Sequence, residues 1–68
     1  MKIKINGKIK HLSDNIKTIS GLIEHLNDKI PQLYAIEKNG KIIYKENYNT
    51  EYINDSDEIE IVMFCGGG

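Results

Sequence analysis

The sequence lacks several features on which common protein functions depend. It contains no arginine, so it lacks the bidentate guanidinium group that proteins prefer for contacts with phosphate and guanine. It contains a single cysteine, Cys65, which excludes an internal disulfide framework and a metal site built from cysteines alone. We therefore expect a protein of the reducing cytoplasm.

Long apolar runs and a strong net charge are also missing. No stretch approaches the ~20 apolar residues of a membrane span, and the N-terminus alternates lysine with isoleucine, unlike a signal peptide. The net charge is −1, so no overall field attracts nucleic acid or an anionic membrane, and neither is expected as a partner. The length of 68 residues, of which 40% are hydrophobic, fits one small globular domain.

The N-terminal residues predict a β-hairpin. Residues 2–5 alternate polar and apolar side chains, which is the period of a half-buried strand. Asn6-Gly7 favours a type I′ turn, and residues 8–12 return as the second strand. Because Leu12 breaks the alternation, this strand should end or bulge near His11. The side chains expected to face the core are Ile3, Ile5 and Ile9. The lysines between them should face water, and without interleaved aromatic residues they do not predict a nucleic-acid site.

A short helix is predicted next, with Thr18 as its N-cap. Four apolar residues then follow at the i, i+3, i+4 and i+7 spacing that places them on one helix face. These are Ile19, Leu22, Ile23 and Leu26. Gly21 within the helix suggests close packing on the sheet, and Pro31 should end the helix before it is reached.

The second half of the sequence predicts three more strands. Residues 34–38 and 41–44 flank Asn39-Gly40, a second hairpin turn, and residues 58–64 form the last strand. The irregular segment between them is expected to contact the core through Tyr48, Tyr52 and Ile53. In the last strand, Ile59, Ile61 and Met63 should share one face, and Glu58, Glu60, Val62 and Phe64 the other.

The element order is therefore β-β-α-β-β-β, and the single helix must cover one face of one sheet. The first and last strands are the most apolar, so we expect them to lie centrally and to run parallel. This arrangement predicts an α+β β-grasp, or ubiquitin-like, fold with a mixed sheet of about five strands and one helix on one face. Residues 1–64 should form the domain, and residues 65–68 a flexible C-terminal tail.

Few residues are suited to catalysis or to holding a cofactor. His11 and His25 are the only histidines and have no partner at metal-ligand spacing, so no metal site is predicted. Asp55 and Asp57 lie in a predicted turn and are expected to form that turn rather than an acid–base pair. We therefore predict that the chain is not an enzyme and binds no cofactor itself.

The most unusual feature is the ending Phe64-Cys65-Gly66-Gly67-Gly68. Three glycines cost entropy to order and bury no side chain, so we expect them to serve a function other than folding. Extended, the last four residues reach about 13–14 Å, and without Cβ atoms they fit a narrow channel in a partner. The chain begins with methionine and carries no tag, so we expect a native C-terminus that presents the carboxylate of Gly68.

The whole chain resembles the ThiS-type sulfur carrier proteins of thiamine thiazole biosynthesis. The matching stretches are Ile5-Asn6-Gly7, Thr18-Ile19 with Leu22-Ile23, Asn39-Gly40-Lys41-Ile42-Ile43, Asp57-Glu58-Ile59-Glu60-Ile61-Val62, Phe64 and Gly66-Gly67-Gly68. The terminal glycines on a short β-grasp pattern are the most specific of these signals.

The resemblance implies a carrier whose Gly68 carboxylate is activated by a partner. An E1-like adenylyltransferase of the ThiF type would adenylate it, with ATP and Mg²⁺ bound by that partner. Sulfur from a cysteine desulfurase or sulfurtransferase would convert it to a thiocarboxylate, from which a ThiG-type thiazole synthase takes the sulfur. Gly66 and Gly67 would thread the partner channels.

The residues before the glycines are expected to contact the partners. Val62 and Phe64 have outward parity and predict a docking patch, although Phe64 has the alternative of folding back over the sheet edge. Cys65 stands where the family has a small or aliphatic residue. It is either an apolar replacement or a thiol that exchanges with the carried sulfur.

Other functions stay open at this point. The small subunit of molybdopterin synthase and other thiocarboxylate carriers share the fold and the glycine ending. A ubiquitin-like modifier would instead join Gly68 to a target lysine through an isopeptide bond. A plain binding module would have inert glycines.

Overall fold

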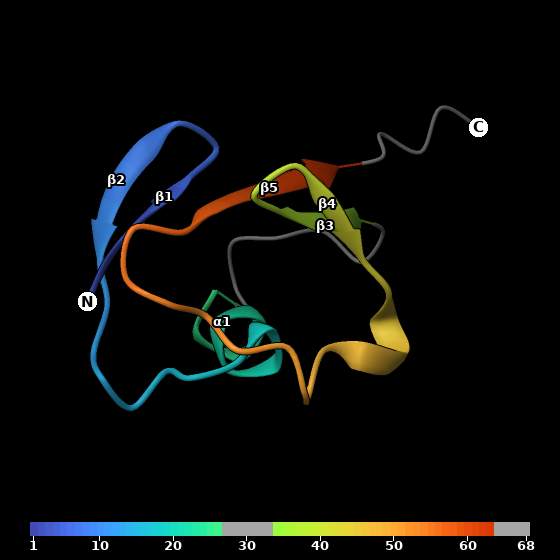
Figure 1. Cartoon of the computed structure of the whole chain (residues 1–68), viewed down its shortest axis with the longest axis horizontal. Helices are drawn as coiled ribbons and strands as arrows, with labels where there is room; N and C mark the ends of the chain where they lie inside the picture. Colours follow the sequence, from blue (N-terminus) through green and yellow to red (C-terminus); the bar gives the residue numbers. More distant parts are fainter. Residues whose placement is uncertain (27–33, 64–68) are drawn as a thin grey trace.

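The computed structural model describes residues 1–26 and 34–63, and the elements there follow the predicted order (Figure 1). They are β1 (Lys2–Ile5), β2 (Lys8–His11), α1 (Ile19–His25), β3 (Tyr34–Lys38), β4 (Lys41–Ile43), the 3₁₀ helix η2 (Lys45–Asn47) and β5 (Glu58–Met63). β2 ends at His11, as predicted, and β4 ends at Ile43, one residue earlier than predicted. Pro31 and Phe64 lie outside the described residues.

The strands form one mixed sheet in the order β2-β1-β5-β3-β4. β1 and β5 run parallel, with Ile5 opposite Ile59, and the other three pairings are antiparallel. α1 lies on one side of this sheet (Figure 1). The predicted α+β arrangement, with one helix on a five-strand sheet and adjacent parallel first and last strands, is confirmed.

Both predicted hairpin turns are present and have the backbone that asparagine and glycine favour. Asn6 and Gly7 have φ values of 50° and 81°, and Asn39 and Gly40 have 53° and 83°. Two consecutive positive φ angles define the type I′ turn, whose twist matches that of the flanking strands. The two Asn-Gly pairs therefore fix the registers of the β1–β2 and β3–β4 hairpins.

The helix begins where its capping residue predicts. The Thr18 hydroxyl accepts a hydrogen bond of 3.1 Å from the Gly21 amide and satisfies one of the free N–H groups of the first turn. Ile19 and Leu22 are fully buried, and Ile23 is half-buried against the same core. The predicted apolar stripe is thus the face that α1 presents to the sheet.

The hydrophobic core of the described residues lies between α1 and the inner face of the sheet. Every strand except β2 contributes isoleucine to it, and α1 and two connecting segments complete it. Its members are Ile3, Ile5, Leu12, Ile19, Leu22, Ile36, Ile43, Ile53, Ile59 and Ile61.

Ile9 was predicted to face the core, and this prediction is wrong: its side chain is 56% exposed. The two-residue turn places Lys4 opposite Ile9 and Ile5 opposite Lys8. Directly opposed residues on neighbouring strands share a face of the sheet, so Ile9 lies with Lys4 on the face away from α1. Leu12, just after β2, is buried instead.

The segment between β4 and β5 is only partly anchored as predicted. Ile53 is buried and Tyr48 is half-buried against the core, but the Tyr52 side chain is exposed, contrary to the prediction. The main chain of Tyr52 carries the contact, as an isolated bridge to Thr18. Burial raises the pKa of the Tyr48 phenol above its usual 10.0, and the charge of a neighbouring Tyr34 phenolate adds to the rise.

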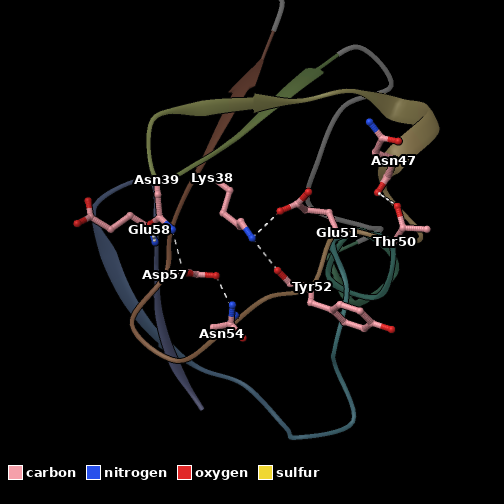
Figure 2. Close-up of polar contacts among 9 residues, drawn as sticks. All are labelled: Lys38, Asn39, Asn47, Thr50, Glu51, Tyr52, Asn54, Asp57 and Glu58. Carbon is pink, nitrogen blue, oxygen red and sulfur yellow. Dashed lines mark hydrogen bonds and ion pairs between the residues drawn. The ribbon is translucent and has the colours of Figure 1, made fainter.

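Lys38 ties this segment to β3 (Figure 2). Its Nζ donates to the Tyr52 carbonyl oxygen at 2.8 Å and lies 2.6 Å from Glu51 Oε2. The Lys38 side chain is 15% exposed, and its two contacts connect the loop to the sheet.

Gly21 was predicted to allow close packing of the helix on the sheet, and this prediction is wrong. A Cβ atom built on Gly21 would lie 3.7 Å from Thr18 Oγ1 and 3.9 Å from Ile16 Cγ2, which are ordinary van der Waals distances. The glycine therefore adds backbone entropy to the unfolded chain without a packing benefit in the folded one.

Replacing Gly21 by alanine is expected to raise the free energy of unfolding by about 0.5–1 kcal/mol, because alanine is the better helix former and fits without a clash. Urea denaturation of the two proteins measures the difference. Gly7→Ala is the control: Gly7 has φ of 81°, so the same substitution there should destabilise the protein. A less stable Gly21→Ala variant would contradict the open environment of this position.

Candidate functional site

The residues predicted to act gather at and beyond the C-terminal end of β5. Of these, the structure describes Val62, the second-to-last residue of the strand. The others lie outside the described residues: Phe64, Cys65, Gly66, Gly67 and Gly68. The part of the site that the structure describes is therefore the end of β5 and the sheet around it.

β5 is held on both of its edges. On one side β3 pairs with it antiparallel as far as Tyr34 opposite Met63. On the other side the regular pairing with β1 reaches Ile5 opposite Ile59. The Asn6 side chain then extends this edge, because its amide accepts from the Ile61 N–H at 2.7 Å and donates to the Ile61 carbonyl oxygen at 3.3 Å.

Val62 faces away from the helix, as predicted, and is 38% exposed. Its neighbour Ile61 is buried on the inner face, so the alternation of a strand directs Val62 outward. Ala35 lies directly opposite Val62 on β3. These two residues place apolar surface on the open face of the sheet beside the strand end.

Ile42 adds apolar surface to the same face and was not among the residues predicted for the site. It lies on β4 opposite Glu37 and is 52% exposed. A signal was present, since Ile42 and Ile43 are adjacent in a strand and cannot both point inward. We refer to Ala35, Ile42 and Val62 as the outer patch.

Three glutamates lie on this face beside the outer patch. Glu60 is directly opposite Glu37, and Glu58 is the next outward-facing residue of β5. Like charges directly opposed across strands are unfavourable, so the Glu37–Glu60 pair does not stabilise the sheet. Lys4 lies directly opposite Glu58, so this acidic side chain offsets the charge of one of the outward-facing lysines of β1.

Asp55 and Asp57, the two aspartates of the turn before β5, have structural roles. Asp57 is only 8% exposed, and its carboxylate accepts hydrogen bonds from Asn39 Nδ2 at 3.0 Å and from the Asn54 amide at 2.8 Å (Figure 2). Asp55 accepts from the Lys2 amide at 2.7 Å. Both aspartates therefore order the turn before β5, as predicted.

The histidines do not come together with other ligands. His11 and His25 are both exposed, on β2 and α1. Across residues 1–26 and 34–63, no group of three or more His, Cys, Asp or Glu side chains is placed to hold a metal ion. Within the same ranges, no helix has the length and apolar character needed to cross a membrane.

Comparison with protein families gives a match to the ThiS family over residues 3–68. The sulfur carrier protein ThiS of Bacillus subtilis is 38% identical over 66 residues, which cover 97% of this chain and 98% of that protein. Thiazole synthases of Paramagnetospirillum magneticum and Magnetococcus marinus are 37% and 34% identical over the whole of this chain. The chain spans about a fifth of the length of each of these two enzymes, 20% in both cases.

Solved structures give the same family. The crystal structure of the thiamine biosynthesis protein ThiS from Geobacter metallireducens matches with a TM-score of 0.83 and 25% identity, over the full length of both chains. A solution structure of a thiamine biosynthesis protein from the same organism matches with a TM-score of 0.78 and 27% identity, over all of this chain and 88% of the other.

Proposed function

The chain belongs to the ThiS family, and from this premise we propose that it is a sulfur carrier, not an enzyme, that delivers sulfur for the thiazole ring of thiamine. The observation that carries the proposal is the alignment with Bacillus ThiS over 97% of this chain and 98% of that one. The sheet geometry supports it, because the last described strand is central and only Phe64 and Cys65 separate it from the three glycines in the sequence.

The reacting group in this proposal is the carboxylate of Gly68. A carboxylate is a poor acyl donor, so a ThiF-type adenylyltransferase activates it with ATP, forming an acyl-adenylate and releasing pyrophosphate. The partner supplies the ATP site, the Mg²⁺ and the stabilisation of the developing charge. The chain contributes the carboxylate, on glycines that pass through a channel too narrow for side chains.

Sulfur then replaces the adenylate. The persulfide of a cysteine desulfurase or sulfurtransferase attacks the acyl-adenylate and displaces AMP, which gives an acyl disulfide. A thiol then reduces this disulfide, is itself oxidised to a disulfide, and releases the C-terminus as a thiocarboxylate. A ThiG-type thiazole synthase accepts the sulfur from it, an oxygen atom from the substrate or from water replaces the sulfur, and the carboxylate of Gly68 is regenerated for another cycle. We assign residues 1–64 to the folded carrier domain and residues 65–68 to the sulfur-carrying tail, and place the cycle in the cytoplasm, where a free Cys65 stays reduced.

The outer patch is the surface through which we propose that partners recognise the domain. Val62 and Ala35 expose apolar area next to the strand end, and Ile42 extends it. The adjoining Glu37 and Glu60 favour a partner surface that is apolar at its centre and basic at its rim. Phe64, Cys65, Gly66 and Gly67 would continue this contact along the tail.

The likeness to two thiazole synthases supports the thiazole pathway over the other thiocarboxylate carriers. Molybdopterin synthase small subunits use the same activated glycine, and ubiquitin-like modifiers use it to form an isopeptide bond. The chemistry of the product, rather than that of activation, distinguishes these alternatives.

Removing Gly68 is expected to abolish activation without unfolding the domain. The deletion shortens the tail by about 3.3–3.6 Å, which withdraws the carboxylate from the reacting distance at the ATP phosphates. ATP–pyrophosphate exchange with the ThiF-type enzyme should therefore fall to background, while the thermal unfolding transition stays unchanged.

Gly21→Ala is the matched control, because it alters a glycine in the folded domain and leaves the tail intact. It should support exchange at the wild-type rate. Exchange that persists after deletion of Gly68 would contradict the assignment of Gly68 as the reacting residue. Absence of exchange with the full-length chain would contradict the carrier proposal and favour a plain binding module.

Replacing Val62 by aspartate is expected to raise the KM of the ThiF-type enzyme for this carrier about tenfold, because a charge in the centre of an apolar contact must be desolvated. The value of kcat should change little, since the tail is intact. Steady-state exchange measured against carrier concentration separates the two parameters.

Ile9→Asp is the control for this substitution. Ile9 has the same outward orientation and greater exposure, but it lies on β2 in line with the start of β5. Its KM should equal that of the wild type. Equal effects of Val62→Asp and Ile9→Asp would show that the outer patch is not the docking surface.

A further inference from the structure

The two Asn-Gly turns do more than reverse the chain, because each asparagine side chain bonds to β5 or to the residue before it. Asn39 Oδ1 accepts from the Glu58 amide at 2.9 Å, and its Nδ2 donates to Asp57 Oδ1 at 3.0 Å (Figure 2). Asn6 makes both of its side-chain bonds to Ile61, near the other end of the strand. β5 is therefore gripped by one asparagine at its beginning and by another shortly before its end.

The Asn6 side chain makes the hydrogen bonds to β5 that the main chain of a longer β1 would make. The last main-chain bond from β1 runs from the Asn6 N–H to the Ile59 carbonyl oxygen at 2.9 Å. With φ of 50°, Asn6 then turns the chain away from β5 into Gly7. Its side-chain amide offers one acceptor and one donor, as a further strand residue would, and it satisfies both main-chain groups of Ile61 on this edge.

We propose that Asn6 is a positioning residue for the carrier reaction: it holds the end of β5 in the plane of the sheet and so sets the direction in which the C-terminal segment leaves the domain. The inference rests on the proposed carrier function. Only Val62 and Met63 separate Ile61 from Phe64, so the strand direction that Asn6 fixes at Ile61 is that of the last described residues before the C-terminal segment.

Asparagine is the residue type that this position requires. The position has a positive φ, which asparagine and glycine tolerate best. Glycine provides no side-chain bond, and aspartate keeps the acceptor for the Ile61 N–H but loses the donor to the Ile61 carbonyl. The three residues therefore form a graded series at an unchanged backbone.

Asn39 provides a matched control within the same chain. Like Asn6, it is followed by glycine, and its φ of 53° is close to the 50° of Asn6. Its side chain also makes two hydrogen bonds, of 3.0 and 2.9 Å. One of its bonds goes to the buried Asp57 carboxylate, so Asn39→Gly should cost at least as much stability as Asn6→Gly. The two variants differ in which end of β5 they release.

The contact itself is tested by amide hydrogen exchange on the isolated chain. In Asn6→Gly, exchange at Ile61 should accelerate while exchange at Glu58 stays protected. In Asn39→Gly, the pattern should be reversed. Unchanged protection of Ile61 in Asn6→Gly would overturn the inference without reference to any partner.

The function of the contact is tested by ATP–pyrophosphate exchange with the ThiF-type enzyme, at a temperature at which both variants are folded. Asn6→Gly should lower kcat/KM for the carrier about two- to tenfold, the equivalent of one net hydrogen bond. Asn39→Gly should leave kcat/KM at the wild-type value despite its lower stability. Asn6→Asp should restore part of the loss, because the shorter of the two bonds is kept.

The outcomes separate this inference from the function on which it rests. If the wild-type chain supports exchange and both glycine variants lose the same activity, or neither loses any, Asn6 is a structural residue and the inference is overturned. If the wild-type chain supports no exchange, the carrier function is contradicted, and the inference falls with it.

Discussion

The structure depends on the central position of β5. The last strand inserts between β1 and β3, and it runs parallel to the first strand of the chain. A parallel pair of strands requires a long connection, and here that connection contains α1, the β3–β4 hairpin and the segment around Tyr48. Ile59 and Ile61 place the inner face of β5 in the middle of the core. The residues after Met63 therefore follow, in the sequence, the strand at the centre of the sheet.

Much of this fold could be predicted from the sequence because its determinants are local. Alternation defined the strands, Asn-Gly pairs defined the hairpins, and Thr18 marked the start of α1. Ile9 was misplaced although the two-residue Asn6-Gly7 turn sets the register that pairs it with Lys4 on the outer face. Tyr52 was misplaced because its exposure depends on the path of a loop, which local sequence does not determine. The side-chain bonds of Asn6 and Asn39 were missed for a related reason: both reach β5, which follows Asn6 by more than fifty positions in the chain.

The candidate site could be predicted from the sequence only in part. The outward direction of Val62 follows from strand parity and is confirmed. The same rule would have predicted the exposure of Ile42. The roles of Phe64, Cys65 and the three glycines stay predictions that rest on the sequence and the family. In the role that we propose, recognition and chemistry are separate. Partners would recognise the apolar and acidic face of the sheet, while the carboxylate at the end of the three glycines would react inside the partner.

The central claim is that this chain carries sulfur on its C-terminal glycine. Intact-protein mass spectrometry tests it most directly, after incubation with the ThiF-type enzyme, ATP, cysteine and a desulfurase. The account predicts a mass gain equal to the exchange of one carboxylate oxygen for sulfur, localised to Gly68 by fragmentation and absent when ATP is omitted. An unchanged mass, with an enzyme that thiocarboxylates another carrier in the same mixture, would contradict it.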